Sequence, residues 1–308
     1  MIYPISYSIP SECFCKNKTK NKKIIDIAKL VPGKLDTYIY NDQETYYKMY
    51  QEGKFGITHK KYGWDCLRHY EILANNCIPL FKNLENCPKN TMINIPKNDI
   101  IYINKKFMNK NLSEDEYAKQ LNKIFNYSIN NLTCKKNAEY FINKILDLNS
   151  DLKNKKNIKI LMLSGMIGYR NVNYTRELLS IGLRKILNEN FIEYPKINVI
   201  YKNCKNIKKY IGKGFTYGKI LDDININRDN IENRIKNKEF DIIIYGKTGK
   251  KRGEIDDLIN LKYWNTVHKN YDKNKIIFIY GGDLLRDKND KDLVYHQNYG
   301  ICFVRELK

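Results

Sequence analysis

The second half of the chain alternates short, continuously apolar runs with longer segments in which apolar residues recur at helical spacing. Uninterrupted apolar runs are typical of strands that are buried on both faces of a parallel sheet. The predicted strands are 158–163, 197–201, 241–245, 276–280 and 300–304, and the predicted helices include 174–188 and 254–269. Strands and helices that alternate in this way indicate a doubly wound α/β domain.

The first half is also mixed, although its pattern is less regular. The predicted strands are 38–40, 55–58, 78–81 and 100–103, and the predicted helices are 43–51, 65–75, 114–125 and 138–146. A polar, charged segment at 148–157 predicts a boundary between two domains, 1–150 and 151–308. We therefore expect two Rossmann-like α/β domains that face a cleft, because ligands of such sheets bind at the carboxyl ends of the strands.

Segment 55–81 carries the most specific chemistry. Its sequence, FGITHKKYGWDCLRHYEILANNCIPLF, predicts a strand, a basic loop with a glycine, a short amphipathic helix and a second strand. Asp65 is expected to cap the helix, with Asp65, Arg68 and Glu71 on its polar face. A helix N-terminus beside lysines attracts anions, and a guanidinium can bind a diphosphate through paired hydrogen bonds. The alternative is an ordinary surface helix on which Arg68 and Glu71 form an i,i+3 pair.

Residues 65–79, DCLRHYEILANNCIP, resemble the donor-binding motif of the exostosin-like glycosyltransferases. Residues 53–58 resemble the strand before that motif, residues 85–88 resemble a variant of viral and microbial members, and the likeness covers about 37–92. The resemblance implies a GT-B fold, in which two Rossmann-like domains enclose a nucleotide-sugar. It also implies that Arg68 contacts the diphosphate, that Glu71 contacts the ribose or sugar, and that the donor is a uridine diphosphate sugar.

Two features depart from the family pattern. Asn76 stands where the family usually has glycine, so the turn after the helix can differ. The donor-like segment also comes first in the chain, whereas exostosins place the donor domain second. The chain is therefore expected to be either a permuted GT-B arrangement, with its acceptor side at 151–308, or a donor-like domain joined to an unrelated partner domain.

Further donor-binding candidates lie in two loops. Around the predicted strand and helix of the first half they are Thr58, Lys61, Tyr62 and Gly63. In the second half, Gly165 and Gly168 follow the first strand, so their loop is expected to face the cleft, with a plain tight turn as the alternative. The basic loop 246–251 lacks the full G-x-x-x-x-G-K-[ST] pattern and is expected to be a basic cleft loop or an ordinary solvated one.

The candidate general base is Asp283, because it follows the strongly apolar run 276–280 and so lies at the carboxyl end of a strand. The alternative is that Asp283 caps the next helix. His69, His59 and Asp65 are rival bases, and His69 is expected beside Arg68 on the cleft-facing arc of the helix. Acids in a D-x-D setting at the end of a strand are missing from the sequence, so we expect a metal-independent transferase with no cofactor beyond its nucleotide-sugar.

The formal net charge of +21 changes the set of possible partners. It fits attraction to phosphates, and it fits equally a codon bias that enriches Lys, Asn, Ile and Tyr. The acceptor is expected to be a glycan or glycolipid, with hydroxylated DNA as the second choice. A non-enzymatic, basic nucleic-acid-binding protein is the competing class and predicts a basic stripe with interleaved aromatic residues.

The eight cysteines form no C-x-x-C pair, so reduced and mostly buried thiols are expected. Lys, Asn or Asp interrupts every apolar stretch, which argues against a membrane span. The first residues lack the pattern of a secretory signal, and we therefore expect a cytoplasmic protein of a virus, phage or bacterium, in the host cytoplasm if viral.

Overall fold

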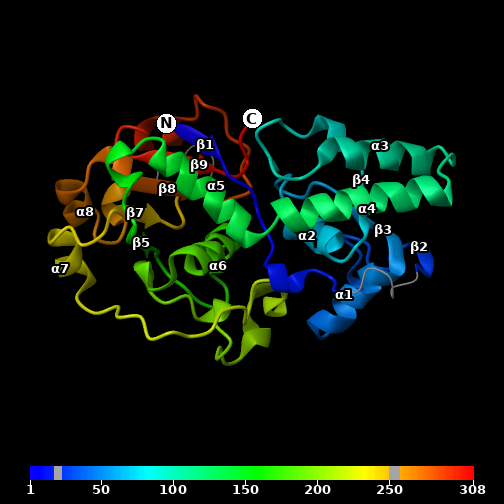
Figure 1. Cartoon of the computed structure of the whole chain (residues 1–308), viewed down its shortest axis with the longest axis horizontal. Coiled ribbons are helices and arrows are strands. Elements are labelled where there is room, and N and C mark those ends of the chain that lie inside the picture. The colour runs from blue at the N-terminus through cyan, green and yellow to red at the C-terminus, as the bar shows by residue number, and fades with distance from the viewer. Residues whose placement is uncertain (17–22, 250–256) are drawn as a thin grey trace.

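The computed structural model describes residues 1–16, 23–249 and 257–308 and is an α/β protein with two parallel sheets (Figure 1). In the described residues the larger sheet has six strands in the order β1-β9-β8-β7-β5-β6, and the smaller has the order β2-β3-β4. The larger sheet comprises β1 (Ile2–Pro4), β5 (Ile160–Leu163), β6 (Phe191–Tyr194), β7 (Ile242–Tyr245), β8 (Ile276–Tyr280) and β9 (Ile301–Val304). The smaller comprises β2 (Ile25–Ile27), β3 (Gly53–Thr58) and β4 (Ile78–Phe81).

Helices cover both faces of the larger sheet, so its strands are apolar on both sides. Ile160 and Met162 face α5 (Cys134–Leu146) and α6 (Tyr174–Leu187). Leu161 and Leu163 belong to the core on the opposite face, with α7 (Ile231–Lys236), α8 (Trp264–Asn270) and α9 (Lys291–His296). The strands are continuously apolar because they are the middle layer of a three-layer α/β/α arrangement, as predicted for a doubly wound sheet.

The smaller sheet packs with the remaining helices, α1 (Gln43–Glu52), α2 (Leu67–Ala74), α3 (Lys97–Met108) and α4 (Glu114–Asn131). Gly56 lets α2 approach the sheet closely, because a Cβ at this position would lie 3.0 Å from the Ile72 side chain. Strand β3 pairs with β4 over Phe55–Thr58. This packing fixes α2 against the sheet and its N-terminus beyond the carboxyl end of β3.

Strand pairing crosses the sequence position expected to divide the domains. Strand β1 pairs with β9, and α5 packs against α6. Both β1 and α5 precede residue 150, whereas their partners follow it. Between them, residues 10–132 form the smaller sheet and its helices, on the right in Figure 1. The larger unit is therefore assembled from both ends of the chain, with the smaller unit inserted after its first strand.

Two predicted strands of the first half are wrong. Residues 38–40 form no strand; they follow a 3-10 turn at Leu35–Thr37 and run along the edge of a cavity. Residues 100–103 lie within α3, where the buried residues Ile100, Ile103 and Asn104 have helical spacing. In both cases a short apolar run was predicted as a strand, but the segment pairs with neither sheet of the structure.

Two predictions in the second half also need correction. Residues 197–201 contain a 3-10 turn at Asn198–Ile200, and the strand beside β5 is β6 instead. The buried Glu193 interrupts the apolar pattern of β6, and it is tolerated because Arg184 donates to it at 2.7 Å. Of the helix expected at 254–269, residues 254–256 lie outside the described residues, and α8 begins only at Trp264.

Within the part of the chain that the structure describes, no helix is long and apolar enough to cross a membrane.

Candidate functional site

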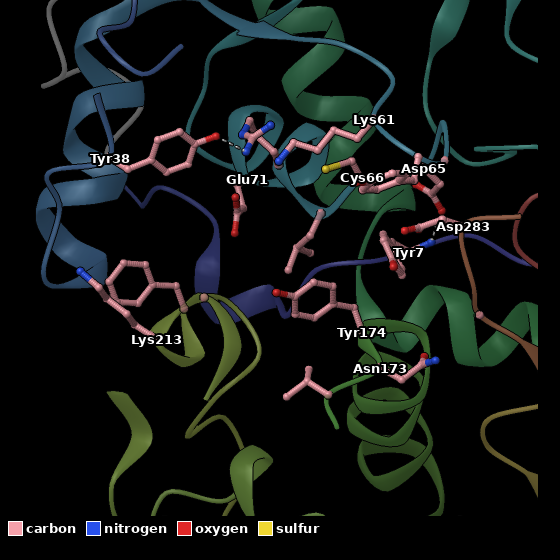
Figure 2. A pocket seen from close by; sticks show the side chains of 18 of the residues that line it. Tyr7, Tyr38, Lys61, Asp65, Cys66, Glu71, Asn173, Tyr174, Lys213 and Asp283 are labelled. Atoms are coloured by element: carbon pink, nitrogen blue, oxygen red, sulfur yellow. Dashed lines mark hydrogen bonds between the residues drawn. The ribbon is translucent and has the colours of Figure 1, made fainter. Parts of the chain in front are cut away.

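A cavity of about 580 Å³ lies between the two units (Figure 2). The smaller unit contributes the loop after β3 and the first turns of α2, and the larger unit contributes the segments after β5 and β8. The lining residues used below are Tyr7, Tyr38, Tyr40, Tyr46, Lys61, Tyr62, Gly63, Asp65, Cys66, Arg68, Glu71, Asn173, Tyr174, Gly212, Lys213, Phe215, Gly281, Gly282 and Asp283. Carboxyl ends of parallel strands from both sheets thus face one cavity, which is where ligands of α/β proteins bind.

Arg68 is a cation in the wall of this cavity with unused hydrogen-bonding capacity. Its side chain is buried, with an exposed fraction of 8% for the residue. Nη2 donates to the Tyr38 hydroxyl at 2.9 Å, the bond marked by the dashed line at Tyr38 in Figure 2. Nε and Nη1 have no hydrogen-bond partner among the described residues. Buried nitrogens of Arg176 and Arg184 also lack a partner among them, but of these three arginines only Arg68 lines the cavity, where its donors can reach an acceptor.

Glu71, one turn further along α2, is held by hydroxyl groups. Tyr46 donates to Oε2 and Thr216 donates to Oε1, each at 2.6 Å. Burial raises the pKa of the Glu71 carboxyl, against the lowering effect of these hydrogen bonds. In Figure 2 the carboxyl group points into the cavity, where it can accept hydrogen bonds from ligand hydroxyls.

The alternative of an exposed surface helix with an Arg68–Glu71 ion pair is wrong. Every residue of α2 is buried, and the two side chains have different partners. The apolar arc packs on the sheet, and the polar arc forms part of the cavity wall. Asn76, after the helix, has a left-handed φ of 52°, so it adopts the conformation that glycine usually supplies at this position.

Asp65 lines the cavity but does not cap α2. The N-cap is Cys66, and its side chain makes no capping hydrogen bond. The Asp65 carboxylate instead accepts from the Tyr7 backbone N–H at 2.7 Å and from the Tyr70 hydroxyl at 2.9 Å. Burial raises its pKa to about 6. Asp65 therefore ties the N-terminal segment to the loop, and α2 keeps an uncapped N-terminus at the cavity.

Asp283 lines the same end of the cavity as Asp65 and follows β8, as predicted from its strand. Arg305 reaches it from the residue after β9, and its Nη2 forms an ion pair with Asp283 Oδ1. The same guanidinium donates from Nε to the Gly281 carbonyl at 3.1 Å and from Nη1 to Glu306 Oε1 at 2.9 Å. Nη1 also donates to the Asp65 carbonyl oxygen. Arg305 therefore fixes the loops of both units that carry the two acids.

Glu306, the next residue after Arg305, also binds the loop of the smaller unit; we call Arg305 and Glu306 together the clamp. Its carboxylate accepts from the backbone N–H groups of Trp64 and Asp65 at 3.0 and 2.8 Å. Burial raises the pKa of Glu306 to about 7, although Arg305 beside it opposes the shift. The loop that carries Lys61 and Gly63 is thus held by residues far away in sequence.

His69 and Thr58 lie in the core of the smaller unit and not at the cavity. His69 Nε2 is 2.8 Å from the Trp64 carbonyl, which requires a proton on Nε2, and Nδ1 accepts from Thr58 Oγ1 at 3.0 Å. Burial lowers the pKa of His69 to about 3, so the ring is neutral. The expected cleft-facing position of His69 is wrong, because its side chain packs on Phe81 on the other side of α2.

The second glycine-containing loop is not part of the cavity wall. Neither Gly165 nor Gly168 contributes to the lining, and a Cβ at either position would meet no described atom within 4 Å. Among residues 246–249 of the basic loop none lines the cavity, and Lys250 and Lys251 lie outside the described residues. From the segment after β5, the cavity is reached by Val172, Asn173 and Tyr174 instead.

Sequence reasoning missed the aromatic part of the wall. Tyr38 and Tyr40 lie in a segment predicted as a strand, while Lys213 and Phe215 lie in a stretch without periodicity. Lys213 is held there by its hydrogen bonds to the Tyr40 carbonyl at 2.7 Å and to Asn41 Oδ1 at 2.8 Å. Only the abundance of tyrosine and lysine in the sequence hinted at such a surface.

In residues 1–16, 23–249 and 257–308, no three or more His, Cys, Asp or Glu side chains are grouped so that they could hold a metal ion. The neighbouring acids Asp222 and Asp223 form ion pairs with Lys202 and Lys196, respectively.

Comparison with known proteins gives no assignment: no protein-family model matches the chain, and no curated protein or solved structure matches it. The functional argument therefore depends on the geometry of the cavity.

Proposed function

We propose that this protein is a glycosyltransferase that moves a sugar from a nucleotide-sugar, with a uridine diphosphate sugar as the first choice, to a hydroxyl acceptor. The observation that carries the proposal is Arg68, which lines the cavity and whose Nε and Nη1 have no hydrogen-bond partner among the described residues. A diphosphate supplies the acceptors that these donors lack. The cavity volume of about 580 Å³ lies within the range of small-molecule sites.

The leaving diphosphate has several stabilising groups. Arg68, the ammonium group of Lys61 and the uncapped N-terminus of α2 converge on the same side of the cavity. In Figure 2 the Lys61 side chain extends across the cavity from near Asp65. Fixed donors and dipoles aimed at a developing negative charge lower the barrier for departure of the diphosphate.

Asp283 is the base that we propose for the acceptor. Arg305 binds Oδ1, while Oδ2 has no partner among the described residues and the side chain is 54% exposed. Oδ2 takes the proton of the acceptor hydroxyl, the hydroxyl oxygen bonds to the anomeric carbon, and the bond from that carbon to the diphosphate breaks. Both Asp65 oxygens are already hydrogen-bonded, and neither His69 nor His59 lines the cavity, so none of the three rivals is as well placed.

The proposed fold type is a GT-B-like arrangement with the donor-like unit early in the chain. Two features support it, namely the parallel sheets that present their carboxyl ends to one cavity and the resemblance around α2. Because β1 and α5 belong to the larger unit, the donor-like unit is inserted near the N-terminus of the other unit. This insertion accounts for the unusual position of the donor-like motif.

Nucleic acid, as acceptor or as sole ligand, is the second candidate, and one observation favours it. A hollow of about 700 Å³ is lined by Lys202, Lys205, Lys208, Lys209 and Lys219, with no acidic residue among its lining residues. The same stretch continues into Gly212 and Lys213 of the cavity. Oligonucleotide binding that weakens in the Lys205→Glu/Lys208→Glu double variant, and not in an exposed-lysine control, Lys119→Glu on α4, would support this candidate.

The decisive experiment is calorimetric titration of the unmutated protein, Arg68→Met and Glu71→Gln with uridine diphosphate and a panel of nucleotide-sugars. Arg68→Met is expected to weaken binding of every diphosphate by roughly a hundredfold, because its fork of charged donors is lost. Glu71→Gln is expected to weaken the binding of nucleoside diphosphates by about tenfold, because we propose that Glu71 contacts ribose or sugar hydroxyls. The binding of inorganic pyrophosphate, which has no such hydroxyls, is expected to change hardly at all.

Slow hydrolysis of one nucleotide-sugar, lost in Asp283→Asn with the binding constant retained, would support transfer chemistry. A protein that binds none of the panel is not a glycosyltransferase of this kind. Oligonucleotide binding without any nucleotide-sugar binding would favour the second candidate.

A further inference from the structure

The cavity has two chemically different ends. Tyr38, Tyr40, Tyr46, Lys213 and Phe215 surround one end, and in Figure 2 Tyr38 and Lys213 lie on the side opposite Asp65 and Asp283. The other end contains the two acids, with Gly281 and Gly282. A ligand bound across the cavity therefore meets aromatic faces at one end and carboxylates at the other.

The aromatic end is a packed structure and not a chance grouping. The Tyr46 ring stacks on Phe215 at a centroid distance of 5.8 Å, and the Tyr40 ring lies 5.8 Å from Tyr46. Lys213 fixes the Tyr40 backbone through a 2.7 Å hydrogen bond to its carbonyl oxygen. Tyr40 and Phe215 are only partly buried, so their rings contribute free surface to the cavity. Planar ring faces of this kind bind nucleobases by stacking.

Polar groups of the wall lie between these two ends. In Figure 2 the side chains of Glu71 and Lys61 lie between Tyr38 on one side and Asp283 on the other. Glu71 accepts from the Tyr46 hydroxyl at 2.6 Å, and Arg68 donates to the Tyr38 hydroxyl at 2.9 Å, so both groups lie beside the aromatic end. Gly63, in the loop that carries Lys61, lies next to Asp283, because a Cβ at Gly63 would be 3.3 Å from the Asp283 Cα. The wall thus leads from aromatic rings, past a carboxylate and unpaired cationic donors, to the proposed base.

We infer that the rings of Tyr40 and Phe215 form a nucleobase subsite and that they set the direction of the bound donor. A nucleoside diphosphate sugar has its base and its sugar at opposite ends, with the ribose and the diphosphate between them, and the wall has its aromatic rings and Asp283 at opposite ends, with polar groups between them. With the base on Tyr40 and Phe215, the ribose reaches Glu71, the diphosphate reaches Arg68 and Lys61, and the sugar lies at Asp283. The inference deepens the proposed function and rests on it for the identity of the sugar end alone.

The test compares two ligands that differ in having a base. Dissociation constants for uridine diphosphate and inorganic pyrophosphate are measured with the unmutated protein, Tyr40→Leu and Phe215→Leu, with guanosine and adenosine diphosphates run in parallel. Tyr127→Leu is the matched control, because Tyr127 is a partly exposed tyrosine on α4 that does not line the cavity. Thermal melts of each variant check that it is folded.

The expected result is binding of the best nucleoside diphosphate that is about tenfold weaker in Tyr40→Leu and in Phe215→Leu, with pyrophosphate and the Tyr127 control unchanged. Equal weakening of both ligands would overturn the subsite, because the rings would then only shape the cavity. Binding of pyrophosphate but of no nucleoside diphosphate would also overturn it. Ring-dependent nucleotide binding without hydrolysis or transfer from any nucleotide-sugar would leave the subsite standing and sink the transferase instead.

Discussion

Two buried arginines have opposite hydrogen-bond status: Arg68 lines the cavity, and Arg305 lies behind the loops that carry Asp65 and Asp283. Arg305 donates to two carbonyl oxygens and two carboxylates, and its side chain has no exposed surface. Arg68 donates only to Tyr38, and two of its nitrogens lack a partner among the described residues. A saturated buried charge holds a structure together, whereas an unsaturated one is available to a ligand. Arg305 therefore holds the loops beside the cavity in place, whereas Arg68 lines the cavity with donors that are free for the ligand we propose.

Arg305→Met should have the largest effect on stability. It leaves Glu306 buried without its cation and releases Asp283 and the Asp65 carbonyl, at a cost of about 3–5 kcal/mol in unfolding free energy. Urea denaturation measures the loss, with the exposed Arg170→Met as the control. A loss as small as that of the control would show that the two units do not depend on this clamp.

Glu306→Gln should remove a pH-dependent contribution to the unfolding free energy. Burial raises the pKa of Glu306 to about 7, so the folded protein binds this proton more tightly than the unfolded chain. Its contribution to unfolding free energy therefore falls as pH rises from about 4.5 to 7, by up to about 3 kcal/mol, and is constant above that range. Denaturation of both proteins across this range measures the difference, and identical pH profiles would contradict the prediction.

Gly63→Ala tests how closely Glu306 packs against the loop that carries Lys61 and Gly63. A Cβ at Gly63 would overlap the Glu306 carboxylate, so we expect a loss of about 1–3 kcal/mol in unfolding free energy. Gly165→Ala is the matched control, since a Cβ there meets no described atom within 4 Å and should change stability by less than about 0.5 kcal/mol. Thermal melts compare the two, and equal melting temperatures would refute the close approach.

Arg68→Met should change stability least, by less than about 1 kcal/mol, because two of its buried donors already lack partners. The contrast with Arg305→Met is the sharpest test of the comparison. A loss of several kcal/mol on urea denaturation would mean that Arg68 is structural as well, and would remove the reason for reserving it for a ligand.

The position of the local motif at the cavity was predictable, and its supports were not. Arg68, Glu71 and Gly63 were expected to lie together and do line one cavity, because one short segment encodes a strand, a loop and a helix in sequence. Asp283 was expected at the carboxyl end of a strand and lies there, because it follows a continuously apolar run. The contacts of Arg305 and Glu306 with the loop at Trp64 and Asp65 left no local signal, since they join residues more than 200 positions apart.

The errors have a related physical cause. Asp65 was expected to cap α2 because caps are read from neighbouring residues, whereas its carboxylate is taken by Tyr7 from the start of the chain. His69 was expected at the cavity because only its angle on the helix was known. The contact with Phe81 and the bond to Trp64 decide its side.

The sequence by itself determined the α/β class, most of the buried strands and the polar arc of α2, because these depend on periodicity and on residues close in the chain. Only the tertiary structure decided that the first strand joins the last one, that the smaller unit is inserted between β1 and α5, and that an aromatic wall faces the two acids. These features depend on contacts between distant segments, and a single sequence carries no local pattern that fixes such contacts.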